Sequence, residues 1–373
     1  MSDKETGRPR GWRSNAPWLA GAAGLTAVGT AAGVSVARSL RRNVSADDPY
    51  EDEDFELLDA DRSYVVTTPD GVDLAVREVG PADARLTVVF AHGFCLRMGA
   101  FYFQRLRLAE QWGRQVRMVF YDQRGHGQSA EASPDSYTVT QLGRDLDTVL
   151  AVMAPRGPVV LVGHSMGGMT VLSHARQFPH NYPARVCGVA ILASAAQGVT
   201  RSPLGEVLQN PALEAAKAAV RFAPGAVSAG RGAAKAVIGP VLKAASFGDD
   251  AVSPSVARYV EKMTHNTSIR TTVEFLHALE THDEAGALPV LQHVPALIAC
   301  GDHDLLTPLA KSQAMARQLP KSELVIVEGA GHMVHMEQPE LINAALERFV
   351  EHATPSRLVA LTRHLRGKAK RNG

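Results

Sequence analysis

The feature of this sequence that most limits its fold is an alternation of short apolar runs with helical patterns. The apolar runs are Leu86–Ala91, Val116–Tyr121, Val159–Val162, Val186–Ala193, Ala296–Cys300 and Leu324–Val327. The helical patterns between and after them are Phe101–Trp112, Thr138–Met153, Gly168–Gln177 and Pro339–His352. Apolar strands that are separated by helices form a mostly parallel sheet with helices on both faces, so we predict an α/β fold. Before them, Ser63–Thr68 and Val72–Val79 flank Pro69-Asp70-Gly71, which predicts a hairpin.

The alternation stops between Gln197 and Leu288. This span is rich in alanine and helical in pattern, with proline and glycine interruptions and no run typical of a strand. We predict that it forms a helical cap over the edge where the parallel strands end. The core is then expected in two parts, residues 63–196 and 289–353, with the cap, residues 197–288, inserted between them.

Charge is balanced in total but unevenly distributed along the chain. There are 39 Lys+Arg and 38 Asp+Glu, so the chain has no long-range field that would attract nucleic acid. Asp47–Asp61 holds nine acids and no base, whereas Arg357–Gly373 holds six bases and no acid. We expect both to be solvated flanks: an arginine-flanked acidic linker over residues 38–62 and a basic tail over residues 354–373.

Composition excludes several other classes of protein. Hydrophobic residues make up 45% of the chain and charged residues 21%, which is typical of globular domains and not of disordered chains. The three cysteines, Cys95, Cys187 and Cys300, are widely spaced. They form neither a disulfide framework nor a paired metal-binding motif.

The N-terminal region contains a long uncharged stretch. Ala16–Ala37 follows a basic leader over residues 1–15 and has 22 residues without a charge. A helix of that length spans a bilayer core of ~30 Å. Arg38, Arg41 and Arg42 come directly after it, which argues against a cleaved signal peptide. We expect a membrane anchor here; the alternative is a disordered leader of alanine and glycine, with the protein in the cytoplasm.

The most specific motif is Gly163-His164-Ser165-Met166-Gly167, a G-x-S-x-G. It follows the predicted strand Val159–Val162 and begins a helical pattern, which is the context that a nucleophile elbow requires. The sharp turn needs small residues on both sides of Ser165, and it holds the serine hydroxyl clear of the backbone. We therefore predict that Ser165 is a nucleophile.

A serine hydroxyl needs a base, and the base needs an acid. His332 lies in Gly329-Ala330-Gly331-His332, between the strand Leu324–Val327 and the last helix, and is the predicted base. His335 is its rival, expected to pack inside the following turn. Of the two aspartates after Ala296–Cys300, we expect Asp304 to be the catalytic acid and Asp302 to be a turn residue. The chain order of nucleophile, acid and base agrees with this architecture.

An oxyanion hole would complete the site. His92-Gly93-Phe94-Cys95 follows the strand Leu86–Ala91, and a glycine there lets the backbone direct the N–H of Phe94 into the site. The second donor would be the N–H of Met166, directly after the nucleophile. We therefore predict that the backbone amides of Phe94 and Met166 bind the oxyanion.

These residues resemble the α/β-hydrolase superfamily, and in particular its capped serine esterase, lipase and cofactor-free haloperoxidase-like branch. The resemblance covers about residues 63–353 and includes Asp122-Gln123-Arg124-Gly125-His126-Gly127-Gln128-Ser129, a segment that in this family mainly shapes the sheet edge. Epoxide hydrolases and haloalkane dehalogenases look similar but carry aspartate at the elbow, so Ser165 favours acyl chemistry. The chain has no HExxH motif and no GxGxxG after a strand, and the resemblance implies neither a metal nor a cofactor.

The resemblance implies a carboxylesterase or lipase-like hydrolase that works through an acyl-enzyme on Ser165. A helical cap would line the pocket with apolar side chains, so the expected partner is a small-molecule ester with a hydrophobic acyl or alcohol group of medium length. Two alternatives stay open at this point. The same residues can catalyse acyl transfer or thioester hydrolysis, and a ligand-binding protein can keep them with little turnover.

Overall fold

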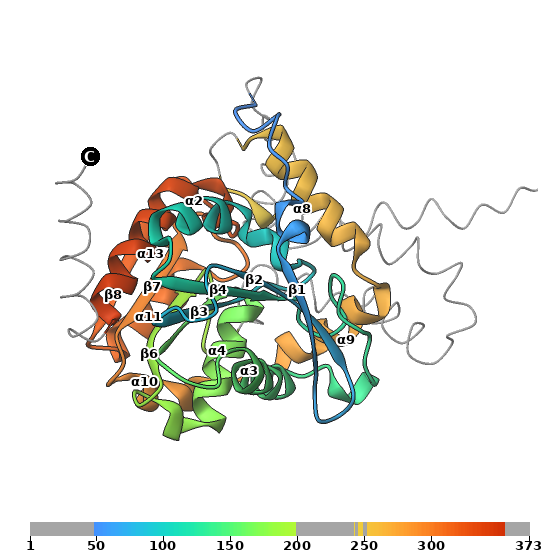
Figure 1. Ribbon diagram of the computed structural model, residues 1–373. Helices are drawn as coiled ribbons and strands as arrows, with labels where there is room; N and C mark the ends of the chain where they lie inside the picture. The colour runs from blue at the N-terminus through green and yellow to red at the C-terminus, as the bar shows by residue number, and fades with distance from the viewer. Residues whose placement is uncertain (1–47, 199–241, 243–244, 249–251, 355–373) are drawn as a thin grey trace, which may run out of the picture. The chain divides into compact units, whose positions relative to one another are not determined.

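The computed structural model describes residues 48–198, 242, 245–248 and 252–354, and these contain one eight-stranded sheet (Figure 1). The strands are β1 (Arg62–Thr67), β2 (Asp73–Val79), β3 (Leu86–Ala91), β4 (Val116–Tyr121), β5 (Val159–His164), β6 (Val186–Leu192), β7 (Ala296–Gly301) and β8 (Ser322–Val327). Their order in the sheet is β1-β2-β4-β3-β5-β6-β7-β8. The predicted strands Leu86–Ala91 and Val116–Tyr121 agree with β3 and β4 to the residue.

Strand direction decides where functional residues gather. β2 is antiparallel to β1 and β4, and the six strands from β4 to β8 in the sheet order are parallel. The carboxyl ends of β3, β5, β7 and β8 therefore lie at the same edge, where ligands bind in sheets of this kind. The mostly parallel sheet and the hairpin before it confirm the predicted fold.

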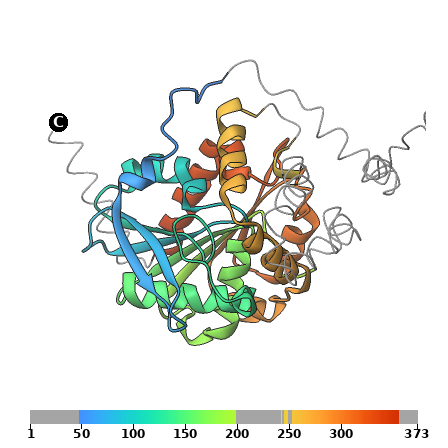
Figure 2. The same cartoon turned by 90° about the vertical axis from the view of Figure 1, so that its right-hand side faces the viewer.

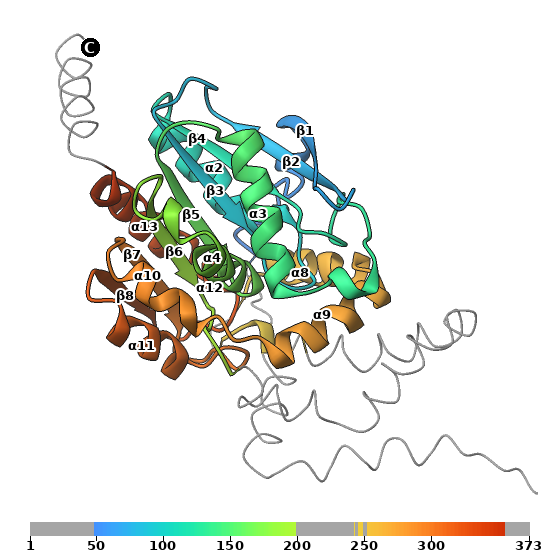
Figure 3. The same cartoon turned by 90° about the horizontal axis from the view of Figure 1, so that it is seen from below.

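Helices cover both faces of the sheet, as Figures 1 and 3 show. On one face lie α2 (Tyr102–Trp112), α12 (Val334–Glu337) and α13 (Pro339–Ala353). On the other lie α3 (Val139–Met153), α4 (Met166–Gln177), α10 (Leu288–Leu291) and α11 (Leu309–Gln318). The patterns expected to form α2, α3, α4 and α13 are confirmed, and α11 is an additional helix.

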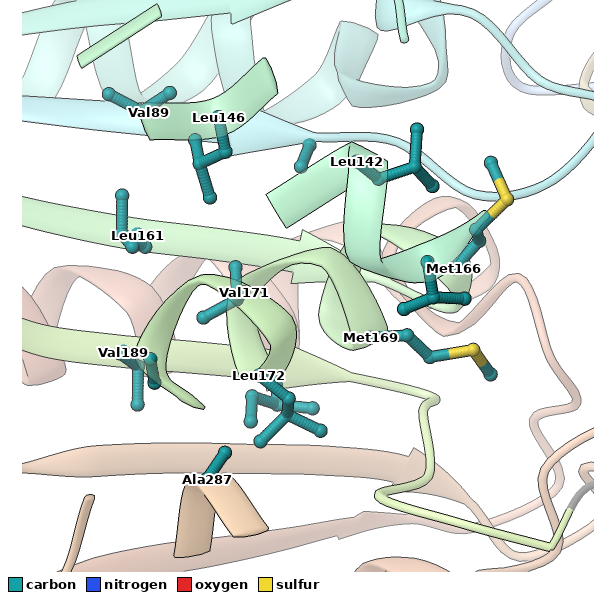
Figure 4. Close-up of a cluster of buried hydrophobic side chains, with 14 of the residues drawn as sticks. Val89, Leu142, Leu146, Leu161, Met166, Met169, Val171, Leu172, Val189 and Ala287 are labelled. Atoms are coloured by element: carbon teal, nitrogen blue, oxygen red, sulfur yellow. The ribbon is translucent and has the colours of Figure 1, made fainter. Parts of the chain in front are cut away.

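The strands are apolar throughout because each face buries its own cluster of side chains. Val89, Leu161 and Val189 are adjacent on β3, β5 and β6, and they pack with Leu146 of α3 and Val171 of α4 (Figure 4). The next or preceding residue on each strand points to the opposite face, toward α2 and α13. This two-sided burial is why the strands show no alternation of apolar and polar residues.

Where the cap was predicted, between β6 and β7, the described residues include two helices of 13 residues each. They are α8 (Pro254–Asn266) and α9 (Ile269–Thr281), and Figure 2 faces this side of the molecule. Ser253 caps the N-terminus of α8, and its hydroxyl accepts a hydrogen bond from the N–H of Val256. The rest of the predicted cap, residues 199–241 with a few that follow, lies outside the described residues.

Residues 48–61, which we call the N-terminal strap, pack against the fold through their apolar residues and some of their acids. Leu58 is fully buried, and the ring of Phe55 stacks on Tyr259 of α8 with 4.8 Å between the ring centroids. The carboxylate of Asp61 accepts a hydrogen bond of 2.9 Å from Arg105 of α2. The expected acidic linker is therefore corrected in part over this range. Its apolar residues reach the core, and bases of the fold pair with four of its acids, Asp48, Glu56, Asp59 and Asp61. Glu51, Asp52 and Asp54 are exposed, as expected of a solvated linker.

In the part of the chain that the structure describes, no helix is both long enough and apolar enough to cross a membrane. The anchor predicted at Ala16–Ala37, the basic leader and the basic tail all lie outside the described residues.

Candidate active site

Ser165 lies between β5 and α4 in a strained backbone conformation, with φ 53° and ψ −118°. A residue with a side chain adopts such a positive φ only where the surrounding structure enforces it. A Cβ on Gly163 would come within 2.3 Å of the carbonyl oxygen of Gly167, and one on Gly167 within 1.9 Å of that of Ala91. Only glycine fits at either position, so the strained turn that exposes the Ser165 hydroxyl follows directly from the motif.

The structure brings Ser165, His332 and Asp304 together. His332 Nε2 lies 2.8 Å from Ser165 Oγ, and its Nδ1 lies 3.0 Å from Asp304 Oδ2. Asp304 is 3% exposed and His332 5% exposed, so water competes little with these hydrogen bonds. Such a chain of hydrogen bonds lets the imidazole take the serine proton while the carboxylate stabilises the imidazolium.

The two aspartates after β7 have different surroundings. Asp304 Oδ1 accepts hydrogen bonds from the backbone N–H groups of Leu306 at 2.8 Å and Thr307 at 2.9 Å. These donors hold the carboxylate toward His332. Asp302 is exposed, and its Oδ1 accepts a hydrogen bond of 2.8 Å from the N–H of Gly329 in the loop after β8. The position of Asp302 is therefore that of a turn residue.

His335 does not reach the serine. It lies in α12, fully buried, with its ring 4.3 Å from that of His164 and 5.2 Å from that of Phe101, measured between centroids. Burial lowers the pKa of His335 to about 3, so the imidazole stays neutral at neutral pH. Packing is the role that its surroundings support.

The backbone around Phe94 and Met166 has the features of an oxyanion hole. Met166 is the first residue of α4, so its N–H has no acceptor inside the helix. Among the hydrogen bonds of the described residues, none is donated by the N–H of Phe94 or of Met166. Gly93 is needed here for close approach rather than for a positive φ, because a Cβ would lie 3.1 Å from Cβ of Ser165. The residue with the left-handed conformation is Cys95, with φ 56°.

The pocket above Ser165 is apolar. Its walls are formed by residues of the core together with residues of α8 and α9. The described residues that line it are Gly93, Phe94, Leu96, His164, Ser165, Met169, Leu242, Ser246, Val260, Thr264, Leu276, Leu279, Leu306, Thr307, His332 and Met333. This set contains no carboxylate, lysine or arginine, and its polar groups are hydroxyls and the imidazoles of His164 and His332.

Residues 88–345 match the model of the Alpha/beta hydrolase family. The chain is an α/β-hydrolase. A curated relative of this α/β-hydrolase is a proline iminopeptidase from Pestalotiopsis fici, 23% identical over 300 residues, with 75% of the chain and 97% of the relative covered.

Solved structures share the fold of this α/β-hydrolase. A thermophilic esterase from Thermogutta terrifontis has a TM-score of 0.63 at 21% identity, with 79% of the chain and all 100% of the esterase covered. A bromoperoxidase from Bacillus anthracis also has a TM-score of 0.63, at 22% identity, with 78% of the chain and 100% of the bromoperoxidase covered. The esterase and haloperoxidase branches that the sequence resembles are thus both among its structural neighbours.

Two residues of this α/β-hydrolase support the site and were not predicted from sequence. The hydroxyl of Thr307 donates to Asp304 Oδ2 at 2.8 Å and lies 3.4 Å from Nδ1 of His332. His164 Nε2 lies 2.9 Å from the backbone oxygen of His332, and because that oxygen can only accept, His164 donates. The spacing of Asp304 and Thr307, with Pro308 after them, is a turn signal that points to Thr307. No local signal points to His164, because its partner follows 168 residues later.

Proposed function

We propose that this α/β-hydrolase is a carboxylic ester hydrolase that forms an acyl-enzyme on Ser165. The observation that carries the proposal is the hydrogen-bonded chain from Ser165 Oγ through His332 to Asp304, at 2.8 and 3.0 Å. Each of the three has the position that acyl transfer needs: a hydroxyl that lines the pocket, a base in contact with it and a buried acid behind the base.

In this mechanism Ser165 Oγ attacks the ester carbonyl carbon while His332 Nε2 takes the hydroxyl proton. The N–H groups of Phe94 and Met166 donate to the oxygen that becomes negatively charged. The tetrahedral intermediate collapses when His332 returns the proton to the leaving alcohol. Water then attacks the acyl-enzyme by the same steps, which releases the acid and restores Ser165.

The lining of the pocket favours a neutral, apolar ester. An enzyme that binds a charged amino terminus, as an iminopeptidase substrate carries, needs an acidic partner for it. Among the described lining residues there is no carboxylate, and Leu242, Val260, Leu276 and Leu279 offer apolar contact instead. Each buried methylene of an acyl or alcohol chain contributes up to about 0.8 kcal/mol of binding. We therefore propose that hydrophobic groups of medium length are preferred over acetate.

The proposal is tested with p-nitrophenyl esters of increasing acyl length and with Ser165→Ala. The wild type is expected to hydrolyse medium-chain esters faster than the acetate, and to react with a fluorophosphonate probe at Ser165. Loss of the nucleophile should lower turnover by on the order of 10⁴–10⁶ while the protein stays folded by circular dichroism. Full activity in a folded Ser165→Ala variant would overturn the mechanism, and a profile that peaks at acetate would overturn the substrate class.

A further inference from the structure

Two buried imidazoles hold the loop that carries Phe94. His92 Nδ1 lies 2.7 Å from the backbone oxygen of Gly93, and His126 Nε2 lies 3.2 Å from the backbone nitrogen of Cys95. His92 is 0% exposed and His126 1% exposed. They come from different elements, since His92 follows β3 and His126 lies in the segment after β4. The two rings therefore contact the peptide units immediately before and after Phe94.

The partners of these rings fix both tautomers. The backbone N–H of Gln123 lies 2.9 Å from His92 Nε2, and the N–H of Cys95 faces His126 Nε2. A backbone N–H can only donate, so Nε2 is the acceptor in each ring and Nδ1 carries the proton. Nδ1 of His92 then donates to the oxygen of Gly93. Nδ1 of His126 donates to the oxygen of Arg124 at 3.0 Å.

We propose that His92 and His126 are positioning residues that direct the N–H of Phe94 at the oxyanion, an inference that rests on the proposed function. The oxygen of Gly93 and the N–H of Phe94 belong to one planar trans peptide, so they point in opposite directions. A bond from His92 to that oxygen therefore turns the N–H away from the ring. His126 fixes the next peptide through Cys95, and the conformation of Phe94 is held from both sides.

Both rings must stay neutral for this arrangement, because a protonated imidazole has no acceptor nitrogen. Burial lowers the pKa of His126 to about 4 and that of His92 well below its usual range. The strained backbone of Cys95, with φ 56°, begins at the nitrogen whose N–H donates to His126, so this contact helps to retain it. The loop is thus pre-organised before substrate binds, which is the condition for strong oxyanion stabilisation.

The test exploits the different hydrogen-bonding atoms of the two rings. An asparagine amide can replace the Nδ1–H donor of a histidine, and a glutamine oxygen can replace its Nε2 acceptor. We expect His92→Asn to keep kcat within about fivefold and His92→Gln to lose on the order of 10- to 100-fold, since removing an oxyanion donor outright costs 10²–10³. At position 126 the order should reverse, with His126→Gln active and His126→Asn impaired.

The impaired variants should have a lower kcat and a KM that changes much less. They should also bind a trifluoromethyl ketone more weakly, because this inhibitor forms an oxyanion on Ser165. His174→Gln is the matched control, because His174 is a buried imidazole of α4 bound to Tyr182 at 2.7 Å and is remote from the loop. It should change stability but leave kcat unchanged. Equal losses for asparagine and glutamine at both positions, or losses confined to KM, would overturn the proposal.

A measurement independent of activity completes the test. The ¹⁵N shifts of wild-type protein labelled at histidine report which ring nitrogen carries the proton, with His92→Asn and His126→Gln used for assignment. Both rings are expected to be protonated at Nδ1, and protonation at Nε2 in either ring would refute the positioning contacts. If the wild type cleaved no ester and resisted the fluorophosphonate, the proposed function would fail while this measurement still decided the geometry of the loop.

Discussion

At the scale of single residues, what makes Asp304 different from Asp302 is the set of groups that each carboxylate meets. Asp304 is buried and accepts hydrogen bonds from Leu306, Thr307 and His332, whereas Asp302 is exposed and meets only the loop after β8 in the hydrogen bonds that the structure describes. These donors fix the direction of the buried Asp304 carboxylate. An exposed carboxylate that holds a turn contributes to stability instead.

We expect Asp304→Asn to lower kcat by on the order of 10⁴, because an amide cannot hold His332 in the tautomer that accepts the proton of Ser165. Asp302→Asn should lower the melting temperature by a few degrees and leave kcat within about twofold. Steady-state kinetics and thermal unfolding of both variants check this pair. The opposite pattern, with the larger loss of kcat in Asp302→Asn, would exchange the assigned roles.

How far the sequence could predict the site depends on how local each constraint is. Ser165 was predictable because its motif places glycine at the two positions where the strained turn leaves no room for a side chain. The predicted residues His332 and Asp304 each follow a recognisable strand. Thr307 was signalled only by its turn. The tautomers of His92 and His126 could not be predicted, because the N–H groups that donate to their Nε2 atoms, those of Gln123 and Cys95, follow other strands and meet the rings only in the folded sheet.

At the scale of elements, the N-terminal strap connects α8 with the core. Asp48 Oδ2 accepts hydrogen bonds from the backbone N–H of Ser255 at 3.0 Å and from its hydroxyl at 2.7 Å. Further along, Phe55 stacks on Tyr259 and Glu56 pairs with Lys262 at 2.7 Å. The sequence of the strap predicted a solvated linker because acidic residues dominate it. The contacts of its aromatic residues could not be predicted, because their partners are distant in sequence.

The aromatic contacts of the strap should stabilise the fold more than its charges do. Phe55→Ala is expected to lower the free energy of unfolding by about 1–3 kcal/mol, since a half-buried ring loses its apolar contacts. Glu56→Gln should cost less than about 1 kcal/mol, because Lys262 is 59% exposed and water screens that pair. Arg97, which Glu56 also binds at 2.7 Å, keeps its second partner Asp59 in the variant. Urea unfolding of the two variants measures both values. A larger cost for Glu56→Gln would mean that the strap is held mainly by charge.

At the scale of the whole molecule, Arg124 joins three parts of the fold that are distant in sequence. It is fully buried in the segment after β4. Its Nη1 lies 2.8 Å from Asp70 Oδ2, at the tip of the β1–β2 hairpin, and its Nε lies 2.6 Å from Asp145 Oδ2 in α3. The family resemblance implies that this segment shapes the edge of the sheet. The Arg124 guanidinium contributes to this role because it joins the antiparallel β1–β2 hairpin to α3 on one face of the sheet.

This network makes the stability of the fold depend on pH, because Asp70 binds Arg124 as an ionised carboxylate and is protonated in acid. The hydrogen bond from Arg124 lowers the pKa of Asp70 from 3.8 to about 2. A carboxyl whose pKa is lower in the folded state stabilises the fold above its unfolded pKa, and this contribution disappears as the pH falls toward the folded pKa. We therefore expect wild type to be more stable than Asp70→Asn at neutral pH, with the difference decreasing between about pH 4 and pH 2.

The expected difference at neutral pH is about 1 kcal/mol, less than the full shift would give, because the Asp70 side chain is 39% exposed and partly screened. Urea unfolding of both proteins across this pH range isolates Asp70, since every other titrating group is common to the pair. Asp135→Asn, which neutralises an exposed carboxylate outside the network, should show no such dependence. A difference that stays constant from neutral pH to pH 2 would mean that Asp70 acts through packing, because only its ionised form can bind the guanidinium strongly.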